Sequence, residues 1–432
     1  MSAYSSNLRT YASRLNGFSR TNLKIPCMNS TGAAPGGQII CDLPTGLLDL
    51  STLTLWAKVS TSTGVPGTPS GYVALPKHGI SGLIQRMEIE SSGGIVSSIA
   101  QSYNQIYTMM AQLQGFDDTP AANTSGAVLE GSQNLAAPPT ANLPATQYAV
   151  KRWLGFLGSV KPDVFPTDLA PLRIRITLDG AYVLASSVVT PAVTASGTIS
   201  AAPAVLATNP TYALSDIFFT CDAIDIADGL FQVARMRFLQ GGGLLEMPFS
   251  NYFQSTAANT GQSFTHRWNC SSRSLDYVFS TLLPQGYNTA QATYDPVLQN
   301  SSAFVRTVVD TVGSVSSLNL TLNSVPATAH RPTPAMAFGL TQSALGLHSL
   351  HDIMPASLTA ATWPSKYFTW VQSYCNTADP GERISSGLST AGSQVVGALE
   401  VIGSGGSNTS WVTAQCTSLL QVGANGYLNV IQ

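Results

Sequence analysis

The chain has 432 residues, enough for two ordinary domains, and 44% of them are hydrophobic, which excludes an intrinsically disordered protein. Charged residues make up only 10% of the chain, against roughly a quarter in typical proteins, and the net charge is −2. Specific nucleic-acid binding is not expected, because neutralising phosphates requires clustered Lys and Arg. Few charges together with 37 Gly and 25 Pro favour a β-rich protein whose surface is largely covered by copies of itself or by partners.

Neither a membrane span nor a secretion signal is expected from the sequence. No apolar run reaches 18 residues, and the N-terminus lacks the apolar core of a signal peptide. We therefore expect synthesis in a reducing compartment. The cysteines form no C-x-x-C pair, so zinc and redox motifs are not indicated, and most are expected to be small buried hydrophobes. They are Cys27, Cys41, Cys221, Cys270, Cys375 and Cys416.

The first 24 residues form a basic arm, since the first acidic residue of the chain is Asp42. On a helical projection, the apolar residues share one stripe and Arg9 and Arg20 lie opposite, with Ser6 as a candidate cap and Gly17 near the end. Such a helix needs a groove or a membrane surface, so we expect an assembly arm; a disordered arm, or a helix packed on its own subunit, is the alternative. The residues given this role are Leu8, Arg9, Tyr11, Arg14, Leu15, Phe18 and Arg20.

Two strands are expected early in the chain because apolar and polar residues alternate. In the first strand, residues 53–59, one face carries Leu53, Leu55, Ala57 and Val59. In the second strand, residues 83–90, the outer face carries Arg86, Glu88 and Glu90.

Gly93 and Gly94 follow the second strand and raise the question of a phosphate-binding turn. No GK[ST] or G-x-G-x-x-G motif follows, no lysine occurs between Lys77 and Lys151, and two upstream glutamates would repel phosphate. Downstream, apolar residues recur every three or four positions, as in a helix. We therefore expect a structural corner from strand to helix at Gly93 and Gly94. The helical stripe consists of Ile95, Ile99, Tyr103, Ile106 and Met110.

Two long inserts without periodicity, residues 117–147 and 185–211, are expected to be loops at the ends of the β domains. Further strands are expected at 172–179, 318–322, 393–403 and 426–432, and a short helix at 349–355. Residues 47–61 and 211–225 share a Leu-Ser pair followed by an alternating strand. This echo suggests two similar β domains with a boundary near residues 211–220.

No residues combine a nucleophile, a base and an oxyanion site. His348 and His351 lie three apart, but no H-E-x-x-H motif or nearby cysteine supports a metal, and a polar turn is favoured. Glu88 and Glu90 share a strand face, whereas catalytic carboxylates of glycosidases flank the sugar from separate elements. We therefore expect no enzymatic activity, no catalytic residues, no cofactor and no metal site.

Three stretches in fixed order resemble the first half of double jelly-roll major capsid proteins. They are "SGLIQRMEIESSGGIVSSIAQSYNQIY", "RWLGFLGSVKPDVFPTDLAPLRIRITL" and "YALSDIFFTCDAIDI". Such proteins build the shells of tailless icosahedral double-stranded DNA viruses, including virophages, polinton-like viruses and nucleocytoplasmic large DNA viruses. The resemblance spans about residues 50–225, and the second half agrees only in length and in its richness in strands.

The resemblance implies an all-β fold of two consecutive eight-stranded antiparallel jelly-roll sandwiches, with long loops and a few short helices. We expect an N-terminal arm at residues 1–24, a first jelly roll at 25–213 and a second at 214–432. It further implies homotrimers of pseudo-hexagonal outline that tile a virion shell, after synthesis in the host cytoplasm or nucleus. Minor capsid and penton proteins are the implied partners, and an N-terminus on the inner face would allow the arm to contact an internal membrane.

A self-assembling capsid subunit is therefore the main hypothesis. The runner-up is a β-sandwich fibre or adhesin that binds a receptor or glycan through its loops. An enzyme such as a glycan hydrolase is the third hypothesis.

Overall fold

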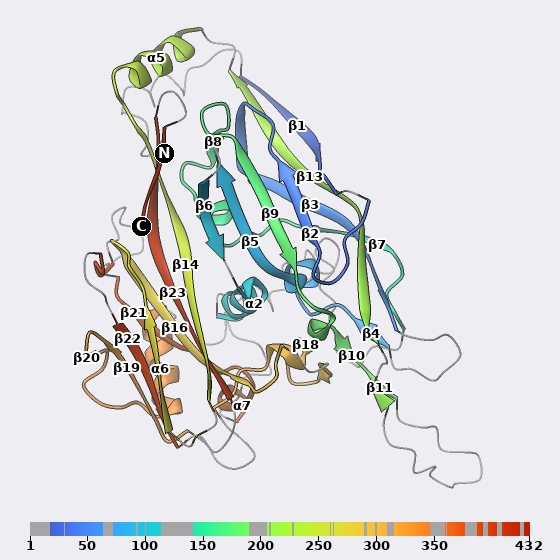
Figure 1. The fold of residues 1–432 in the computed structure, drawn as a ribbon, viewed down its shortest axis with the longest axis vertical. Coiled ribbons are helices and arrows are strands. Elements are labelled where there is room, and N and C mark those ends of the chain that lie inside the picture. The colour runs from blue at the N-terminus through green and yellow to red at the C-terminus, as the bar shows by residue number, and fades with distance from the viewer. Residues whose placement is uncertain are drawn as a thin grey trace.

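The fold is seen in a computed structural model. It describes residues 18–29, 31–63, 72–91, 94–99, 101–113, 141–189, 205–206, 209–226, 229–259, 261, 263–288, 292–298, 300–308, 315–345, 359, 361–375, 387–391, 396–403, 408–423 and 427–432. Figure 1 shows two β-sandwiches side by side, the first in blue to green and the second in yellow to red.

The first sandwich consists of two antiparallel sheets packed around a core. One sheet has the order β1 (Phe18–Pro26), β13 (Thr211–Ile226), β3 (Leu47–Ser62) and β7 (Thr146–Val150), and β8 (Val164–Pro166) also pairs with β3. The other sheet has the order β2 (Gln38–Asp42), β9 (Leu172–Leu178), β5 (Ile84–Ser91) and β6 (Gly94–Ile99).

The second sandwich repeats this arrangement. One sheet has the order β14 (Leu245–Asn259), β23 (Asn408–Val422), β16 (Leu275–Pro284) and β21 (Trp370–Ser373), and β24 (Leu428–Ile431) also pairs with β23. The other sheet has the order β15 (Ser263–Asn269), β22 (Val396–Ile402), β19 (Ser317–Leu322) and β20 (Val325–Pro326).

The two sandwiches share one topology. When the main strands of each are numbered 1 to 8 along the chain, the sheet orders are 1-8-3-6 and 2-7-4-5 in both halves. This is the eight-stranded jelly roll, in which strands from opposite ends of the sequence are neighbours. The predicted fold class, two consecutive jelly-roll sandwiches, is confirmed.

The helices and minor strands lie in the connections between these strands. The helices are α2 (Tyr103–Leu113), α4 (Phe156–Ser159), α5 (Gly229–Gln240), α6 (Pro334–Ala344) and α7 (Thr362–Lys366), with 3₁₀ turns η1 (Gly79–Leu83), η3 (Ala181–Val183) and η4 (Ser302–Phe304). Three small ladders pair β4 (Val73–Ala74) with β10 (Ala185–Ser186), β11 (Val188–Val189) with β12 (Val205–Leu206), and β17 (Tyr294–Asp295) with β18 (Asn300–Ser301). Both α2 and α6 follow the fifth main strand of their sandwich, which extends the likeness between the halves.

Alternation explains the strands that the sequence predicted. On β3 the apolar face formed by Leu53, Leu55, Ala57 and Val59 is fully buried. On β9 buried and half-buried residues alternate along the whole strand, and Arg173, Arg175 and Thr177 lie on its outer face. The strands expected at 318–322, 393–403 and 426–432 correspond to β19, β22 and β24. The helix expected at 349–355 lies outside the described residues.

The predicted corner at Gly93 and Gly94 is wrong in kind. Gly94 pairs with Ser91, so the chain makes a hairpin from β5 to β6, and the helix begins only at Tyr103; Gly93 itself is not among the described residues. The stripe residue Ile95 is 57% exposed on β6, while Ile99 is buried. The helical part of the prediction is confirmed at α2, where Tyr103, Ile106 and Met110 are buried.

The predicted boundary between residues 213 and 214 is also wrong. Strand β13 runs from Thr211 to Ile226 and pairs with β1 and β3 of the first sandwich. The second sandwich begins only with β14 at Leu245. The suggested echo between residues 47–61 and 211–225 therefore does not mark equivalent strands of two domains, because β3 and β13 are neighbours in one sheet.

The two predicted loops, residues 117–147 and 185–211, include residues that belong to strands. Residues 146 and 147 belong to β7, and β10, β11 and β12 lie within the second stretch. Residues 114–140, 190–204 and 207–208 are outside the described part of the chain.

Candidate assembly surfaces and the junction between the sandwiches

The segment after β7 joins the first sandwich to the second. The Phe156 ring lies edge-on to Phe165 of the first sandwich at 5.6 Å and to Phe249 of the second at 5.2 Å, measured between ring centroids. Backbone bonds accompany these contacts: Ser250 N–H donates to Ser159 Oγ at 2.8 Å, and Lys161 N–H donates to the Pro248 carbonyl at 3.0 Å. Aromatic packing and backbone bonding together align β14 against the first sandwich.

A second contact zone lies around α2 and η1. The Gln105 amide donates to the Ala303 carbonyl at 2.8 Å, and the Lys77 backbone N–H donates to Asn300 Oδ1 at 2.8 Å. The buried Arg306 guanidinium donates to Gln112 Oε1. Each bond joins a residue of the first half to residues 300–306 of the second half.

The hydrophobic core is continuous across this junction. One cluster of contacting buried side chains includes Leu55 and Ile174 from the first sandwich and Phe249, Phe304 and Trp411 from the second. Packing at interior density resists relative movement. The two sandwiches therefore form one block with a fixed mutual orientation.

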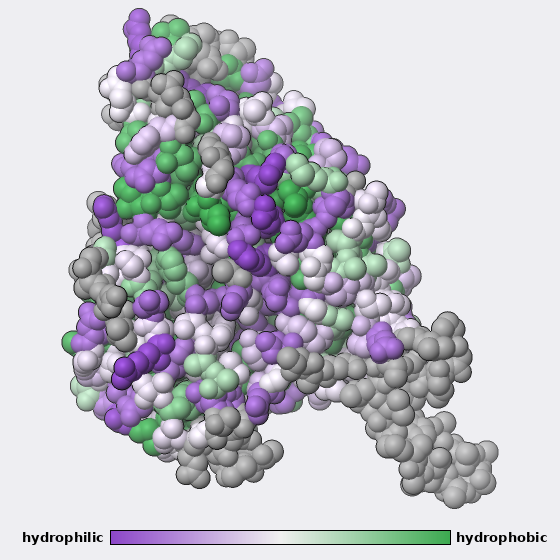
Figure 2. Space-filling view, viewed as in Figure 1, coloured by the Kyte–Doolittle hydropathy of each residue, from purple (hydrophilic) through white to green (hydrophobic). Residues whose placement is uncertain are grey.

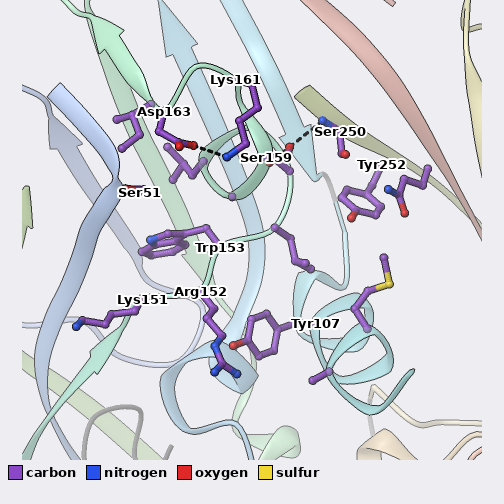
Figure 3. A pocket seen from close by; sticks show the side chains of 18 residues that line it. Ser51, Tyr107, Lys151, Arg152, Trp153, Ser159, Lys161, Asp163, Ser250 and Tyr252 are labelled. Carbon is purple, nitrogen blue, oxygen red and sulfur yellow. Dashed lines mark hydrogen bonds and ion pairs between the residues drawn. The ribbon is translucent and has the colours of Figure 1, made fainter. Parts of the chain in front are cut away.

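A pocket with a volume of about 520 Å³ opens at this junction, between α2, the 151–163 segment and β14. Figure 3 shows Lys161 joined to Asp163, and Ser159 joined to Ser250. The Lys161 Nζ–Asp163 Oδ1 distance is 2.7 Å, and the Ser159 hydroxyl donates to the Gly155 carbonyl at 2.7 Å. These bonds engage the Ser159 hydroxyl and the Lys161 ammonium in structural contacts.

Both carboxylates that were weighed as a catalytic pair lie in ion pairs, Glu88 with Arg86 of its own strand and Glu90 with Arg175 of the neighbouring strand. Glu88 was expected on the outer face of its strand, but it is only 4% exposed and its carboxylate is bound by Arg86. Glu90 is bound by Arg175 at 3.1 Å. The Glu90–Arg175 pair stabilises the β5–β9 ladder, and both carboxylates are engaged by arginines.

His266 is a structural residue of the second sandwich. Its Nε2 lies 2.9 Å from Ser255 Oγ and its Nδ1 lies 2.9 Å from Ser410 Oγ. Burial lowers the pKa of His266 to about 4, so the ring is neutral at physiological pH. His348 and His351 lie outside the described residues, and within the described ones no three His, Cys, Asp or Glu side chains are grouped to hold a metal.

The structure divides the predicted arm. Leu8, Arg9, Tyr11, Arg14 and Leu15 lie outside the described residues. Phe18 and Arg20 do not extend a helix, because they lie in β1, where Phe18 pairs with Ile226. Both residues pair with β13 in an antiparallel ladder, which a helical projection of the arm alone does not predict.

Arg20 anchors β1 to its neighbours. Its guanidinium contacts Asp49 and Asp222 at 2.5 Å each. The Asn22 amide and the Arg20 guanidinium together hold the pKa of the Asp222 carboxyl below its usual range. Arg20 therefore has a structural role within the subunit, which the sequence analysis missed.

Apolar side chains are exposed at several places on the described surface. Figure 2 shows a green apolar area in the upper left of the molecule, over the upper parts of β14 and β23. On α5, Val233, Met236 and Phe238 are exposed. The same helix contains two arginines and no acidic residue. The other large exposed apolar residues are Met28, Tyr72, Ile95, Leu244, Val325, Met336, Leu388 and Tyr427. Contiguous apolar patches are typical of surfaces that contact other molecules, whereas apolar side chains exposed singly are common on any protein.

Neither α5 nor the junction segment was predicted from the sequence. Residues 153–157, "WLGFL", place two aromatic residues and two leucines around one glycine, outside any regular period. This concentration of large apolar side chains was the available signal. In α5 the signal was "VARMRF" without acidic residues. Among the described residues, no helix is both long and apolar enough to span a membrane.

Comparison with known proteins gives matches in structure only. No family model matches the chain, and no curated protein matches its sequence. A chain of the PBCV-1 virus capsid is similar with a TM-score of 0.59 and 13% identity, and the match covers 97% of both chains. The Faustovirus major capsid protein is similar with a TM-score of 0.58 and 9% identity, over 94% of this chain and 90% of that one.

These matches extend over both sandwiches, and the strand order derived above is a jelly roll in each half. The resemblance first seen in residues 50–225 therefore reaches the whole described chain. The chain is a double jelly-roll protein, with the fold of the PBCV-1 and Faustovirus capsid proteins.

Proposed function

We propose that the chain is the major capsid protein of a tailless icosahedral double-stranded DNA virus. The observation that carries the proposal is the pairing of two sandwiches of identical strand order in one rigid block, matched from end to end by a PBCV-1 capsid chain. A protein that merely contained a jelly roll would match in one half only.

The architecture suggests how copies would associate. Three subunits with two similar sandwiches each place six similar units around a three-fold axis, so a homotrimer acquires a pseudo-hexagonal outline that can tile a shell. The small share of charged residues, 10%, and the apolar side chains exposed on α5 suit a subunit that is largely covered by neighbours. We expect each subunit to bury more than the roughly 2,000 Å² at the upper end of standard interfaces.

Further partners follow from this role. We propose location in the virion after synthesis in the host cytoplasm or nucleus, with minor capsid and penton proteins as partners. Residues 1–17 would contact neighbouring subunits, minor proteins or an internal membrane. The fibre or adhesin alternative is not favoured, because the similar structures are capsid chains aligned over nearly their whole length.

The test is the oligomeric state and shape of the purified full chain. Light scattering at micromolar concentration should give three chain masses, and negative-stain images should show compact three-fold particles. Because apolar interfaces resist screening, the trimer should persist when the salt is raised to about 1 M, where Debye lengths fall to about 3 Å. A stable monomer, or elongated fibres, would overturn the proposal.

A further inference from the structure

Four of the six cysteines form two buried pairs, one in each sandwich. In the second sandwich the Cys270 and Cys416 sulfurs are 3.5 Å apart, and both side chains are buried. In the first sandwich Cys27 lies next to Cys41, whose pKa its thiol raises, and both side chains are again buried. The remaining cysteines, Cys221 and Cys375, have no thiol partner among the described residues.

In both pairs one cysteine directly follows a strand and the other lies within a strand. Cys270 directly follows β15 of one sheet, whereas Cys416 lies within β23 of the facing sheet. Cys27 directly follows β1, whereas Cys41 lies within β2 of the facing sheet. The Cys270–Cys416 pair therefore bridges the two sheets of its sandwich, as the inter-sheet disulfide does in immunoglobulin domains, whereas Cys27 and Cys41 are neighbours where the chain turns from β1 into β2.

The surrounding backbone fixes the partners opposite each other. Thr417 N–H donates to the Ser274 carbonyl at 3.0 Å, which holds the turn after Cys270 against β23. Met28 N–H donates to the Ile40 carbonyl at 2.9 Å, so the next residues outward in an antiparallel register are Cys27 and Cys41. A disulfide requires sulfurs about 2.05 Å apart, a distance that small side-chain rotations can reach from 3.5 Å. Two thiols are also an incomplete ligand set for structural zinc, which takes four ligands.

We propose that Cys270 and Cys416 close to an inter-sheet disulfide when the folded protein meets a disulfide oxidant such as oxidised glutathione, and that Cys27 and Cys41 form a second disulfide, in the first sandwich. The chemistry does not depend on the capsid role. If that role holds, the thiols persist in the reducing cell and the bonds close in the released particle, where surroundings are oxidising.

The reaction is ordinary thiol–disulfide exchange. The Cys270 thiolate attacks one sulfur of oxidised glutathione and expels a glutathione thiolate, which forms a mixed disulfide. The Cys416 thiol then loses its proton, attacks the Cys270 sulfur and expels the second glutathione thiolate. Two protein thiols are oxidised, one glutathione disulfide is reduced to two thiols, and the two released protons are taken up by the leaving thiolates.

The environment favours Cys270 as the first nucleophile. The hydrogen bond from Cys416 lowers the pKa of Cys270, whereas the hydrogen bond to Cys270, together with burial, raises the pKa of Cys416. Because Cys416 is fully buried and Cys270 is 4% exposed, we expect slow closure that is limited by local opening.

The test uses the full chain, reduced and then incubated with oxidised glutathione in two arms. One arm starts from folded protein, and the other refolds the chain in the redox buffer, which removes access as a limit. After thiols are blocked with N-ethylmaleimide under denaturing conditions, unreduced peptides are mapped by mass. We expect Cys270 linked to Cys416 and Cys27 linked to Cys41, each with the loss of two hydrogen atoms.

Thermal unfolding provides a second readout. Because Cys270 and Cys416 close a long loop, the oxidised protein should melt about 5–10 °C above the reduced protein. The double variant Cys270→Ala with Cys416→Ala should lose most of this difference, and the control variants Cys221→Ala and Cys375→Ala should keep it. If neither arm yields the 270–416 peptide, or if oxidation leaves the melting temperature unchanged, the proposal is wrong. Trimer formation, measured on the same reduced samples, tests the capsid role separately.

Discussion

Phe156 of the first sandwich lies edge-on to Phe249 of the second, with ring centroids 5.2 Å apart and both side chains buried. This pair stands at the centre of the contact that unites the two jelly rolls. Around it, Ser159 and Lys161 bond to the backbone of β14 at Ser250 and Pro248.

Substituting Phe156→Ala should uncouple the two sandwiches. We expect a loss of about 3–5 kcal/mol, the usual cost of removing a buried phenylalanine. Because Phe156 contacts both halves, urea unfolding should change from one cooperative transition to two. Tryptophan fluorescence and circular dichroism would monitor the unfolding.

The matched control is Phe368→Ala, which removes a fully buried ring from the separate core cluster of the second sandwich. That variant should be destabilised by a similar amount without greater separation of the halves. Equal separation in both variants would show that Phe156 has no special role at the junction.

Gly397 and Gly339 should respond in opposite ways to replacement by alanine. A Cβ on Gly397 would lie 2.1 Å from the ring of Trp268, which pairs with it across β15 and β22. Since Trp268 is buried and cannot retreat, Gly397→Ala should cost about 1–3 kcal/mol. Gly339 lies exposed inside α6 with no atom within 4 Å of an added Cβ, so Gly339→Ala should gain up to about 1 kcal/mol.

Chemical denaturation of the two single variants checks this pair. A neutral Gly397→Ala variant would mean that Trp268 does not cover the glycine in solution. A destabilised Gly339→Ala variant would contradict its place in a helix.

The strands could be predicted because apolar and polar residues alternate between neighbouring positions of the sequence. Leu53, Leu55 and Ala57 could be placed on the core face from the sequence alone, and they are buried there. Ile95 and Ile99 were misassigned because a spacing of four residues satisfies both a strand and a helix. In the structure that ambiguity is resolved by the pairing of β6 with β5, which no local pattern specifies.

Long-range pairing explains the remaining errors. Strand β13 is placed by β1 and β3, whose residues lie more than 100 positions earlier in the sequence, so its sandwich could not be read from its own residues. Phe156 and Phe249 are likewise far apart in the sequence, so their contact could not be read from either local segment. Arg20 was assigned to a helix because its partners Asp49 and Asp222 come from other strands.

His266 should make the second sandwich sensitive to acid. Its pKa is lowered by burial from 6.5 to about 4, so between these values the unfolded chain binds a proton that the folded chain does not. Stability is therefore complete above pH 6.5 and falls as the pH decreases toward 4, by up to about 3 kcal/mol.

The measurement compares urea unfolding at pH 7 and pH 4.5 for the wild type, His266→Gln and the control His330→Gln. His266→Gln carries its own packing cost at both pH values, so the difference between them isolates the titration. We expect a smaller acid loss in His266→Gln and an unchanged loss in His330→Gln, whose histidine is exposed. Equal acid loss in all three would assign the sensitivity to other groups.

Two deletions at the N-terminus should show that the residues before Phe18 act in assembly and that the residues from Phe18 onward act in folding. Residues 18–26 form β1 at the edge of its sheet, and Arg20 joins it to Asp49 and Asp222. Removing residues 1–17 should therefore leave folding and trimer formation intact, with a melting temperature within about 2 °C of the wild type, because the deletion ends before the strand. We expect these trimers to form shells poorly, since Arg9, Arg14 and the apolar residues that precede β1 are lost.

Removing residues 1–26 should have a different effect, because the deletion takes away β1 and exposes the backbone of β13. An unpaired edge strand of this length favours aggregation, so light scattering should show large, heterogeneous species rather than trimers. Arg20→Ala, which keeps the whole arm and loses only the ion pairs, should melt slightly lower and still assemble. Normal shells from the chain lacking residues 1–17 would remove the assembly role of the arm, whereas a stable trimer from the chain lacking residues 1–26 would show that β1 is dispensable and that the arm extends to Pro26.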